Sequence, residues 1–242
     1  MHTHTHTHTN KRDTVVCLVS GGMDSAVCAS IAAAQYDLAF LHANYGQRTE
    51  LRELHCFHLL ASHFGAKHRL VLDLAHFKQI GGSSLLEGDE EVPKVDMNAS
   101  IGHHIPSTYV PFRNGILLAI AASWAEVLGA KKIFLGAVMQ DSSGYPDCRP
   151  EFMLAMNQAI SAGTKPNTQI EIETPLIHLT KKQIVEQGRI LNTPFELTYS
   201  CYQHNDFACG ACESCVLRLR AFLQAGDKDP IVYQSCVDIH KA

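Results

Sequence analysis

The sequence predicts an α/β fold in which a mostly parallel sheet carries helices on both faces. Apolar runs typical of buried strands alternate with segments of helical periodicity along most of the chain. The first of these runs leads through two glycines into a small-residue segment, a pattern typical of a strand, a tight turn and a helix. With 242 residues, 46% of them hydrophobic, the chain can form one such domain with a small appendage.

Strand and helix patterns alternate in the first part of the chain. Short apolar runs predict strands, and longer segments with apolar residues on one face predict helices. The expected elements are a strand over 15–20, a helix over 24–35, a strand over 38–44, a helix over 50–65 and a strand over 68–74.

The periodicity dissolves from Lys78 to Pro111, where Gly, Ser, Pro and charged residues accumulate. A loop this long inside a compact domain is usually functional, for instance as a lid. Regular patterns return with a small-residue helix ended by Gly129 and a buried strand over 131–138. Pro150 suits the first position of a further helix, and a capping box at 180–183 precedes the last predicted helix.

Three polar segments each follow a predicted strand: SGGMDS, NYGQR and MQDSSGYPDCR. Because parallel strands connected by helices place their carboxyl ends at one edge of the sheet, these segments should lie along one rim. We therefore expect the active site at this edge.

Composition excludes several classes of partner. The 20 Lys and Arg residues against 24 Asp and Glu give a net charge of -4, so no basic field predicts nucleic-acid binding. No apolar run is long enough to span a membrane and no secretory pattern precedes the first strand. The expected partner is a small-molecule substrate, with a homodimer left open.

Nine cysteines, four of them between Cys201 and Cys215, favour a reducing compartment and a metal site over disulfides. We therefore expect a cytoplasmic protein. The opening MHTHTHTHT segment is read as a disordered tail or an affinity tag. The expected division is a tail over 1–12, a catalytic domain over 13–200 and a four-cysteine zinc segment over 201–242 packed on the same domain.

The segment VSGGMDS can bind phosphate through its backbone. Two adjacent glycines let successive N–H groups point inward, and the following helix adds its dipole. Asp24 would repel phosphate directly, so it either caps the helix or binds phosphate through Mg²⁺. The expected phosphate-binding residues are Val19, Ser20, Gly21, Gly22, Met23, Asp24 and Ser25.

The last cysteines follow a C-x₇-C-x₂-C-x₂-C spacing. Four thiolates satisfy a tetrahedral Zn²⁺ and leave no open position for catalysis, so we favour a structural zinc. An iron–sulfur cluster is the chemical alternative, because it too is held by four thiolates. The expected ligands are Cys201, Cys209, Cys212 and Cys215, with His204 as a weaker candidate.

The SGGMDS segment resembles the S-G-G-x-D-S signature of the PP-loop pyrophosphatases, which have a Rossmann-like nucleotide-binding architecture. In that family the loop holds the pyrophosphate of ATP while a substrate oxygen attacks the α-phosphorus. The resemblance explains why the lysine of a Walker loop is missing, since the leaving group is pyrophosphate and not a terminal phosphoryl group. ATP and Mg²⁺ are therefore the expected cofactors beside Zn²⁺.

Further segments make the chain similar to one branch of this superfamily, the 7-cyano-7-deazaguanine synthases. The matching segments are SGGMDS, YGQR, IPSTYVPFRN, DSSGYPDCRPEF, ETPL and the cysteine cluster, in the expected order. One position departs from the pattern, because Phe112 stands where a small residue is common.

The resemblance implies ATP-dependent conversion of 7-carboxy-7-deazaguanine and ammonia to the nitrile in queuosine biosynthesis. The path runs through an acyl-adenylate and an amide and releases AMP and pyrophosphate. No protein nucleophile is needed, so catalysis should be positioning and charge stabilisation. The expected catalytic residues are Asp24, Arg113 and Arg149. The expected substrate-binding residues are Gln47, Arg48, Asn114, Tyr145, Asp147, Cys148 and Arg149.

Within these roles, the arginines would neutralise phosphate or carboxylate, and Asp147 would accept hydrogen bonds from the N–H groups of the heterocycle. Tyr145 would stack on the ring or only pack. Cys148 would shape the pocket or act as a thiolate.

Three other functions remain open. The chain could be a sulfur-transferring enzyme acting on tRNA, although it lacks the basic surplus that RNA binding needs. It could join the same activated carboxylate to a different amine, for example on a protein. A non-catalytic nucleotide-binding module is disfavoured by the intact Ser20, Asp24 and Ser25.

Overall fold

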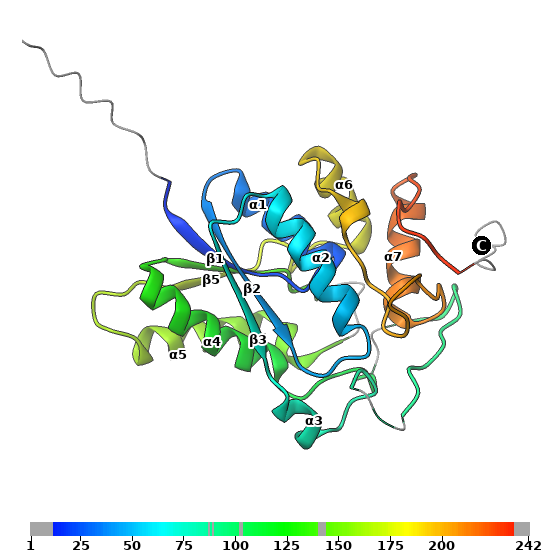
Figure 1. Ribbon diagram of the computed structural model, residues 1–242, viewed down its shortest axis with the longest axis horizontal. Helices are drawn as coiled ribbons and strands as arrows, with labels where there is room; N and C mark the ends of the chain where they lie inside the picture. Colours follow the sequence, from blue (N-terminus) through cyan, green and yellow to red (C-terminus); the bar gives the residue numbers. More distant parts are fainter. Residues whose placement is uncertain (1–11, 87, 89, 102–103, 140–143, 235–242) are drawn as a thin grey trace, which may run out of the picture.

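The protein has a five-stranded, wholly parallel sheet at its centre (Figure 1). A computed structural model describes residues 12–86, 88, 90–101, 104–139 and 144–234. The strand order is β3-β2-β1-β4-β5. The strands are β1 (Thr14–Leu18), β2 (Asp37–Asn44), β3 (His68–Asp73), β4 (Lys132–Leu135) and β5 (Glu171–Glu173). The predicted α/β class with a parallel sheet is confirmed.

Helices connect these strands and continue beyond the last one. They are α1 (Met23–Ala33), α2 (Glu50–His63), α3 (His76–Ile80), α4 (Arg113–Leu128), α5 (Pro150–Gly163), α6 (Lys181–Ile190) and α7 (Glu213–Gln224). Two short 3-10 turns, η1 (Pro146–Cys148) and η2 (Phe195–Leu197), lie next to α5 and after α6. Among the described helices, none combines the length and the apolar character needed to cross a membrane.

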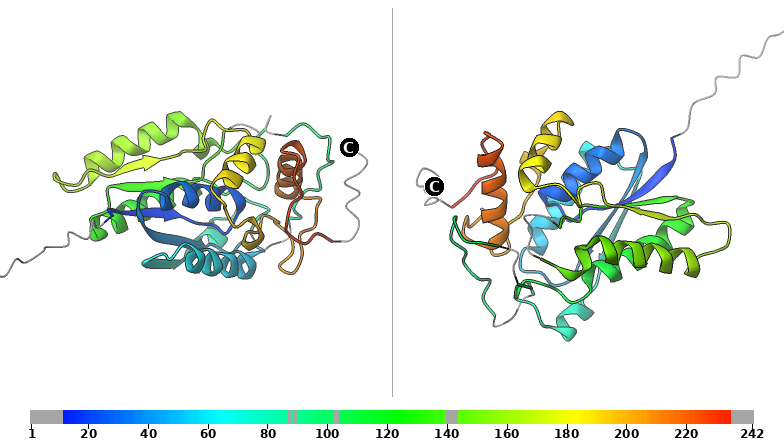
Figure 2. Two further views of the ribbon diagram at one scale, coloured as in Figure 1. Left: turned by 90° about the horizontal axis from the view of Figure 1, so that it is seen from above. Right: turned by 180° about the vertical axis from the view of Figure 1, so that it is seen from behind.

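The sheet is buried on both faces because successive side chains of its strands point to opposite sides. In β1, Val15 and Cys17 join a core with α1, α2, α6 and α7, while Val16 and Leu18 join a second core with α4 and α5. Figure 2 shows the sheet between these two helical layers. Because both faces of the sheet are buried, its strands are apolar along their length, which is the pattern that predicted them as buried strands.

The strand order reverses direction at β1. From β1 the chain proceeds outward through β2 to β3, and it then returns to place β4 on the other side of β1. In open α/β sheets, ligands bind outside the carboxyl ends of the strands at such a reversal. The loop after β1 and the segment after β4 meet at this point.

Three elements were absent from the sequence-based expectation: α3, β5 and α7. The strand β5 has only three residues, too few for a periodic pattern. The helix α7 starts directly after Cys212, so its first turn is part of the cysteine cluster. The expected strand over 15–20 ends at Leu18, because the loop already begins at Val19.

The long segment before α4 contains the short α3 and is otherwise irregular where it is described. Two arginines fasten it through backbone carbonyls. Arg48 donates to the carbonyls of Ser84 and Gly88, at 3.1 and 3.0 Å. Arg220 on α7 donates to those of Met97 and Ala99, at 2.5 and 2.7 Å. That this long segment acts as a lid stays a prediction.

Candidate active site

A cavity of about 260 Å³ lies at the carboxyl ends of β1, β2 and β4. Its walls come from the loop after β1, the end of β2, the first turn of α4, the segment after β4 and the chain between 199 and 218. The cavity therefore lies at the edge of the sheet where the three polar segments predicted the active site. Side chains from both ends of the described chain meet in it.

The loop after β1 offers backbone donors to this cavity. Gly21 has a φ of 89°, a left-handed conformation that favours glycine. The helix α1 begins at Met23, and no side chain caps it. Its first N–H groups are therefore available to an anion. The Ser25 hydroxyl donates to the Gly22 carbonyl at 2.9 Å, which fixes the turn from within.

Asp24 has one occupied and one free carboxylate oxygen. Oδ2 forms an ion pair of 2.6 Å with the ammonium of Lys181, the first residue of α6. Oδ1 is buried and has no hydrogen-bond partner among the described residues. An unpaired carboxylate oxygen beside a loop with free backbone N–H groups suits a Mg²⁺ ion, which prefers oxygen ligands. The residues thus fit the metal that the sequence predicted.

Lys181 also lines the cavity, and sequence reasoning missed it. The capping box of Thr180 and Gln183 did predict where α6 starts. Nothing in the sequence around that box indicates that α6 lies next to the loop after β1. Only the packing of α6 against α1 brings the lysine to Asp24.

Arg113 also lines the cavity, among tyrosines. Its Nη1 donates to the Tyr45 hydroxyl at 2.7 Å, and its guanidinium lies 5.1 Å from the centre of that ring. Tyr145 and Tyr202 line the same cavity. A cation surrounded by aromatic rings can bind a flat heterocycle that carries a carboxylate.

Asp147 lies behind this wall, in η1. Its Oδ2 accepts a hydrogen bond of 2.8 Å from the backbone N–H of Asn114, while Oδ1 is buried without a partner among the described residues. Burial raises the pKa of Asp147. Asn114 and Cys148, its two neighbours, both line the cavity. The unpartnered oxygen therefore lies in a residue next to the cavity lining and not in the lining itself.

Cys148 is a neutral thiol in this setting. Burial raises the pKa of Cys148 to about 12, and the Asn114 side-chain amide donates to its sulfur at 3.2 Å. A thiolate is therefore scarce at neutral pH. Of the two roles expected for Cys148, the structure favours shaping the pocket over nucleophilic chemistry.

Besides Asp147, three further predicted substrate-binding residues lie off the cavity wall. Gln47 is buried, and its side-chain amide is engaged by the Tyr45 backbone N–H at 2.8 Å and by Glu53 at 3.2 Å. Arg48 binds backbone carbonyls of the long segment. Arg149 is exposed at the start of α5. Direct ligand contacts by these three residues stay a prediction that this geometry does not favour.

The four predicted metal-ligating cysteines form a cluster. Their sulfur atoms all lie within 4.8 Å of one another. The Cys209 and Cys215 sulfurs are 3.9 Å apart, close to the separation of about 3.8 Å that bonds of about 2.3 Å give around a tetrahedral zinc. Backbone N–H groups of Gln203 and Cys212 donate to sulfurs at 3.3 and 3.2 Å, as thiolate ligands require. His204 is not part of this cluster.

The cluster is tied to the loop after β1 by a short connection. Tyr199, two residues before Cys201, donates its backbone N–H to the Gly21 carbonyl at 2.9 Å. The Arg52 guanidinium covers the Tyr199 ring at 5.1 Å from its centre. The segment after η2 therefore links the four-cysteine cluster to the loop after β1.

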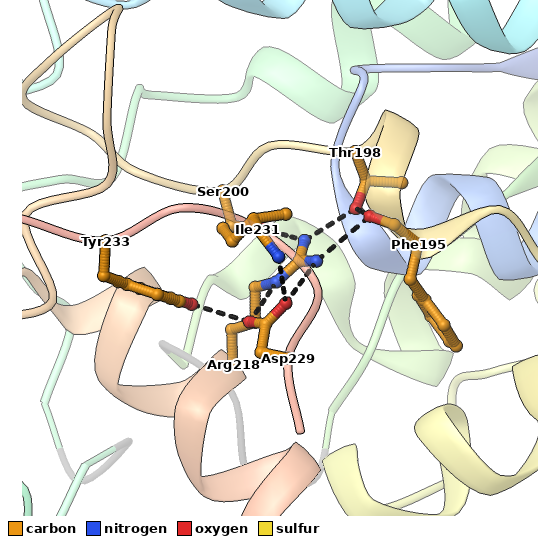
Figure 3. A network of polar contacts seen from close by, with 7 residues as sticks. All are labelled: Phe195, Thr198, Ser200, Arg218, Asp229, Ile231 and Tyr233. Atoms are coloured by element: carbon orange, nitrogen blue, oxygen red, sulfur yellow. Dashed lines mark hydrogen bonds and ion pairs between the residues drawn. The ribbon is translucent and has the colours of Figure 1, made fainter. Parts of the chain in front are cut away.

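A buried ion pair anchors the same segment from below (Figure 3). Arg218 of α7 is 1% exposed and holds Asp229 through two hydrogen bonds of 2.7 and 2.9 Å. The other N–H groups of Arg218 donate to the segment 195–200, which precedes the cysteine cluster. The Asp229 carboxylate also accepts hydrogen bonds from residues 231 and 233. These further partners are Phe195, Thr198, Ser200, Ile231 and Tyr233.

Comparison with known proteins identifies the family. The family model described as "Queuosine biosynthesis protein QueC" matches residues 14–226. The chain belongs to the QueC family. The match begins at β1 and ends just after α7, so it includes both the cavity and the cysteine cluster.

Curated relatives support this membership. A 7-cyano-7-deazaguanine synthase from Koribacter versatilis is 55% identical over 90% of this chain and 92% of its own length. Proteins of the same name from Acidobacterium capsulatum and Chlorobium phaeobacteroides are 54% and 52% identical, each over 92% of this chain. Among solved structures, an NAD+ synthetase from Burkholderia pseudomallei is similar at 12% identity with a TM-score of 0.38, covering 90% of this chain and 75% of its own, which is too distant to argue from.

Phe112, where we expect a departure from the family pattern, has an unusual backbone conformation. Phe112 directly precedes α4 and has a φ of 55°, in the left-handed region that glycine and asparagine adopt more easily. Its ring lies over Gly115, where a Cβ atom would be 2.4 Å from it, and against Phe152. The glycine therefore makes room for the large side chain. Phe112 is half-exposed and does not line the cavity.

Proposed function

We propose that this QueC family member converts 7-carboxy-7-deazaguanine and ammonia to 7-cyano-7-deazaguanine at the expense of ATP. An acyl-adenylate and an amide are the intermediates, and AMP and pyrophosphate are released. The relatives that bear the synthase name support the overall reaction. The observation that carries the proposal is the single cavity that joins an anion-binding loop to an arginine among tyrosines.

The loop side of the cavity would bind the triphosphate. Uncapped N–H groups of α1 and the Lys181 ammonium offer positive charge to a leaving pyrophosphate. The free Oδ1 of Asp24 would hold Mg²⁺, which neutralises phosphate charge. These groups stabilise departure of pyrophosphate when a carboxylate oxygen attacks the α-phosphorus.

The tyrosine side would bind the deazaguanine. Arg113 would orient its carboxylate toward the loop, and Tyr145 would contact the flat ring. The unpaired oxygen of Asp147 would accept from the N–H groups of the guanine-like edge. Placing both reactants in one cavity supplies the orientation that adenylation needs.

The four cysteines would hold a structural Zn²⁺, because four protein thiolates leave no coordination site for substrate. The described cysteines are all free thiols, which fits the cytoplasm as the proposed location.

One assay tests the proposed function. The protein is incubated with ATP, Mg²⁺, 7-carboxy-7-deazaguanine and ammonium, and the products are read by mass spectrometry. We expect the nitrile together with AMP and pyrophosphate. An adenylate that accumulates without amide or nitrile would show that another amine is the acceptor, and absence of any adenylate would refute the proposal.

Removing the Lys181 charge should impair the first step. For Lys181→Met we expect adenylate formation to fall by about 10²- to 10³-fold in kcat/KM, because a preorganised cation on the leaving group is lost. Pyrophosphate release in a coupled assay measures this. Lys182→Met is the matched control, because that lysine is half-exposed and its ion pair among the described residues is with Glu186 on its own helix. Equal losses in the two variants would contradict a role for Lys181.

A methyl group at Gly136 should disturb the phosphate-binding loop from below. A Cβ there would lie 2.9 Å from the Asp24 carbonyl oxygen, an overlap with backbone that cannot move aside. We expect Gly136→Ala to cost about 1–3 kcal/mol of stability and, by shifting the loop, about 100-fold in kcat/KM for ATP. Urea unfolding and adenylation kinetics measure both effects. Gly163→Ala, at a position with open space around it, should change neither.

A further inference from the structure

The cavity wall contains a carboxyl group that the proposed activation of the carboxylate does not use. Glu53 lies in the first turn of α2, keeps part of its surface exposed and lines the cavity. It lies outside the polar segments that the sequence singled out. Its place in the site therefore comes from the structure alone.

Neutral donors hold the Glu53 carboxyl in position. Its Oε1 accepts from the Thr49 hydroxyl at 2.7 Å, and its Oε2 accepts from the Gln47 amide at 3.2 Å. Gln47 is itself fixed by the Tyr45 backbone N–H. Among the ion pairs of the described residues, none includes Glu53. The group is thus oriented without being committed to a cation.

Glu53 also stands where the two halves of the site meet. Its backbone carbonyl packs against Gly21 of the phosphate-binding loop, where a Cβ would be 2.7 Å away. Toward the other side, Arg113 is close enough for its charge to act on the carboxyl. An adenylate formed between the two halves would present its acyl carbon in this part of the cavity.

We propose that the Glu53 carboxylate accepts the proton that ammonium must lose before it attacks the adenylated substrate. This inference rests on the proposed function and deepens it. Ammonium carries no lone pair, so a base is needed wherever the free amine is scarce. Glu53 is the carboxyl on the cavity wall that is bound to neither the Lys181 ammonium nor a backbone N–H.

The proposed step balances in atoms and charge. Ammonium transfers one proton to Glu53 and becomes ammonia, whose lone pair forms the C–N bond to the acyl carbon. The C–O bond to the AMP phosphate breaks and its electron pair leaves with AMP. The adduct nitrogen loses its second proton to water, which gives the amide, and Glu53 returns its own proton to water before the next turnover.

The pKa of Glu53 suits this task. Burial raises the pKa of Glu53 to about 7, against the lowering effects of its hydrogen bonds and of Arg113. The base form therefore dominates above about pH 7 and declines below it, so the ammonium-dependent rate should fall as the pH drops through about 7. The titratable and charged groups around Glu53 are Arg113 on α4, Tyr45 after β2, and Glu50 and Cys56 on α2.

Glu53→Gln tests the inference because it keeps the shape of the side chain and removes the base. Adenylate formation without ammonium, read as pyrophosphate release in a single turnover, should stay within about threefold of the parent. Amide formation with ammonium at neutral pH should fall by about 10²- to 10³-fold. Hydroxylamine, which is already neutral at this pH, should restore acyl transfer. The deficit with ammonium should shrink near about pH 9, where ammonia is present without a base.

Glu50→Gln on the same helix turn is the control and should leave both steps unchanged. If Glu53→Gln loses activity with ammonium and hydroxylamine alike, its role is structural and the inference is overturned while adenylation stands. If the unaltered protein forms no adenylate, the proposed function itself is refuted, and the inference with it.

Discussion

Replacing Asp229 with alanine is expected to destabilise the fold by about 3–5 kcal/mol, because it leaves the Arg218 charge buried without its partner. The Arg218 side chain is 1% exposed and that of Asp229 is 3% exposed, so water cannot take the place of the missing carboxylate. The loss would also free the chain after α7, which Asp229 holds through Tyr233. Urea unfolding followed by circular dichroism measures the change.

Two further variants show whether the loss of stability in Asp229→Ala comes from the unpaired buried charge of Arg218 or from the lost hydrogen bonds. The pair of Lys67 and Asp37 has a lysine side chain that is 57% exposed, so Lys67→Ala should cost less than about 1 kcal/mol. The double variant Arg218→Met with Asp229→Leu removes both charges and should be more stable than Asp229→Ala. A double variant as unstable as the single one would show that the hydrogen-bond network, and not the stranded charge, sets the cost.

Cys212→Ser is expected to lower bound metal and stability together. Cys212 is fully buried, and it both contributes a sulfur to the cluster and immediately precedes α7. A structural site of four thiolates contributes its binding free energy to folding, so the variant should unfold at a clearly lower temperature. Elemental analysis and differential scanning calorimetry measure the two effects, and elemental analysis also distinguishes zinc from iron.

Cys148→Ser serves as the matched control, since Cys148 lies in the cavity and outside the cluster. It should keep full metal content. Full metal occupancy in Cys212→Ser would contradict a site built from all four thiolates. We further expect Cys212→Ser to weaken ATP binding, because the cluster reaches Gly21 through Tyr199.

The parts of the fold that the sequence predicts are those with local causes. The buried apolar run of β1 and the capping box at Thr180 depend on neighbouring residues in the sequence, and both are present as expected. The strand β5 and the helix α7 depend on contacts with distant segments. Lys132 and Glu173, for example, are joined only when β5 pairs with β4.

The same distinction applies to the site. The glycine loop after β1 and the four cysteines are local patterns in the sequence, and the structure shows a left-handed Gly21 before the uncapped α1 and a cluster of the four sulfurs. Lys181 and Glu53 belong to no motif, because each reaches the cavity through the packing of a whole helix. Arg149, in contrast, stands inside a specific motif and is nevertheless exposed. A motif predicts that a segment is used, but not which of its side chains faces the ligand.

The cavity has a consequence for how the protein is synthesised. Leu18 and Arg218 line the same hollow, although they lie near opposite ends of the described chain. On the ribosome, the loop after β1 emerges long before α7. Until α7 is made, the part of the cavity wall that α7 supplies is missing. A nascent chain interrupted before α7 would therefore have a sheet and an anion loop but no enclosed site. Such long-range closure also slows folding.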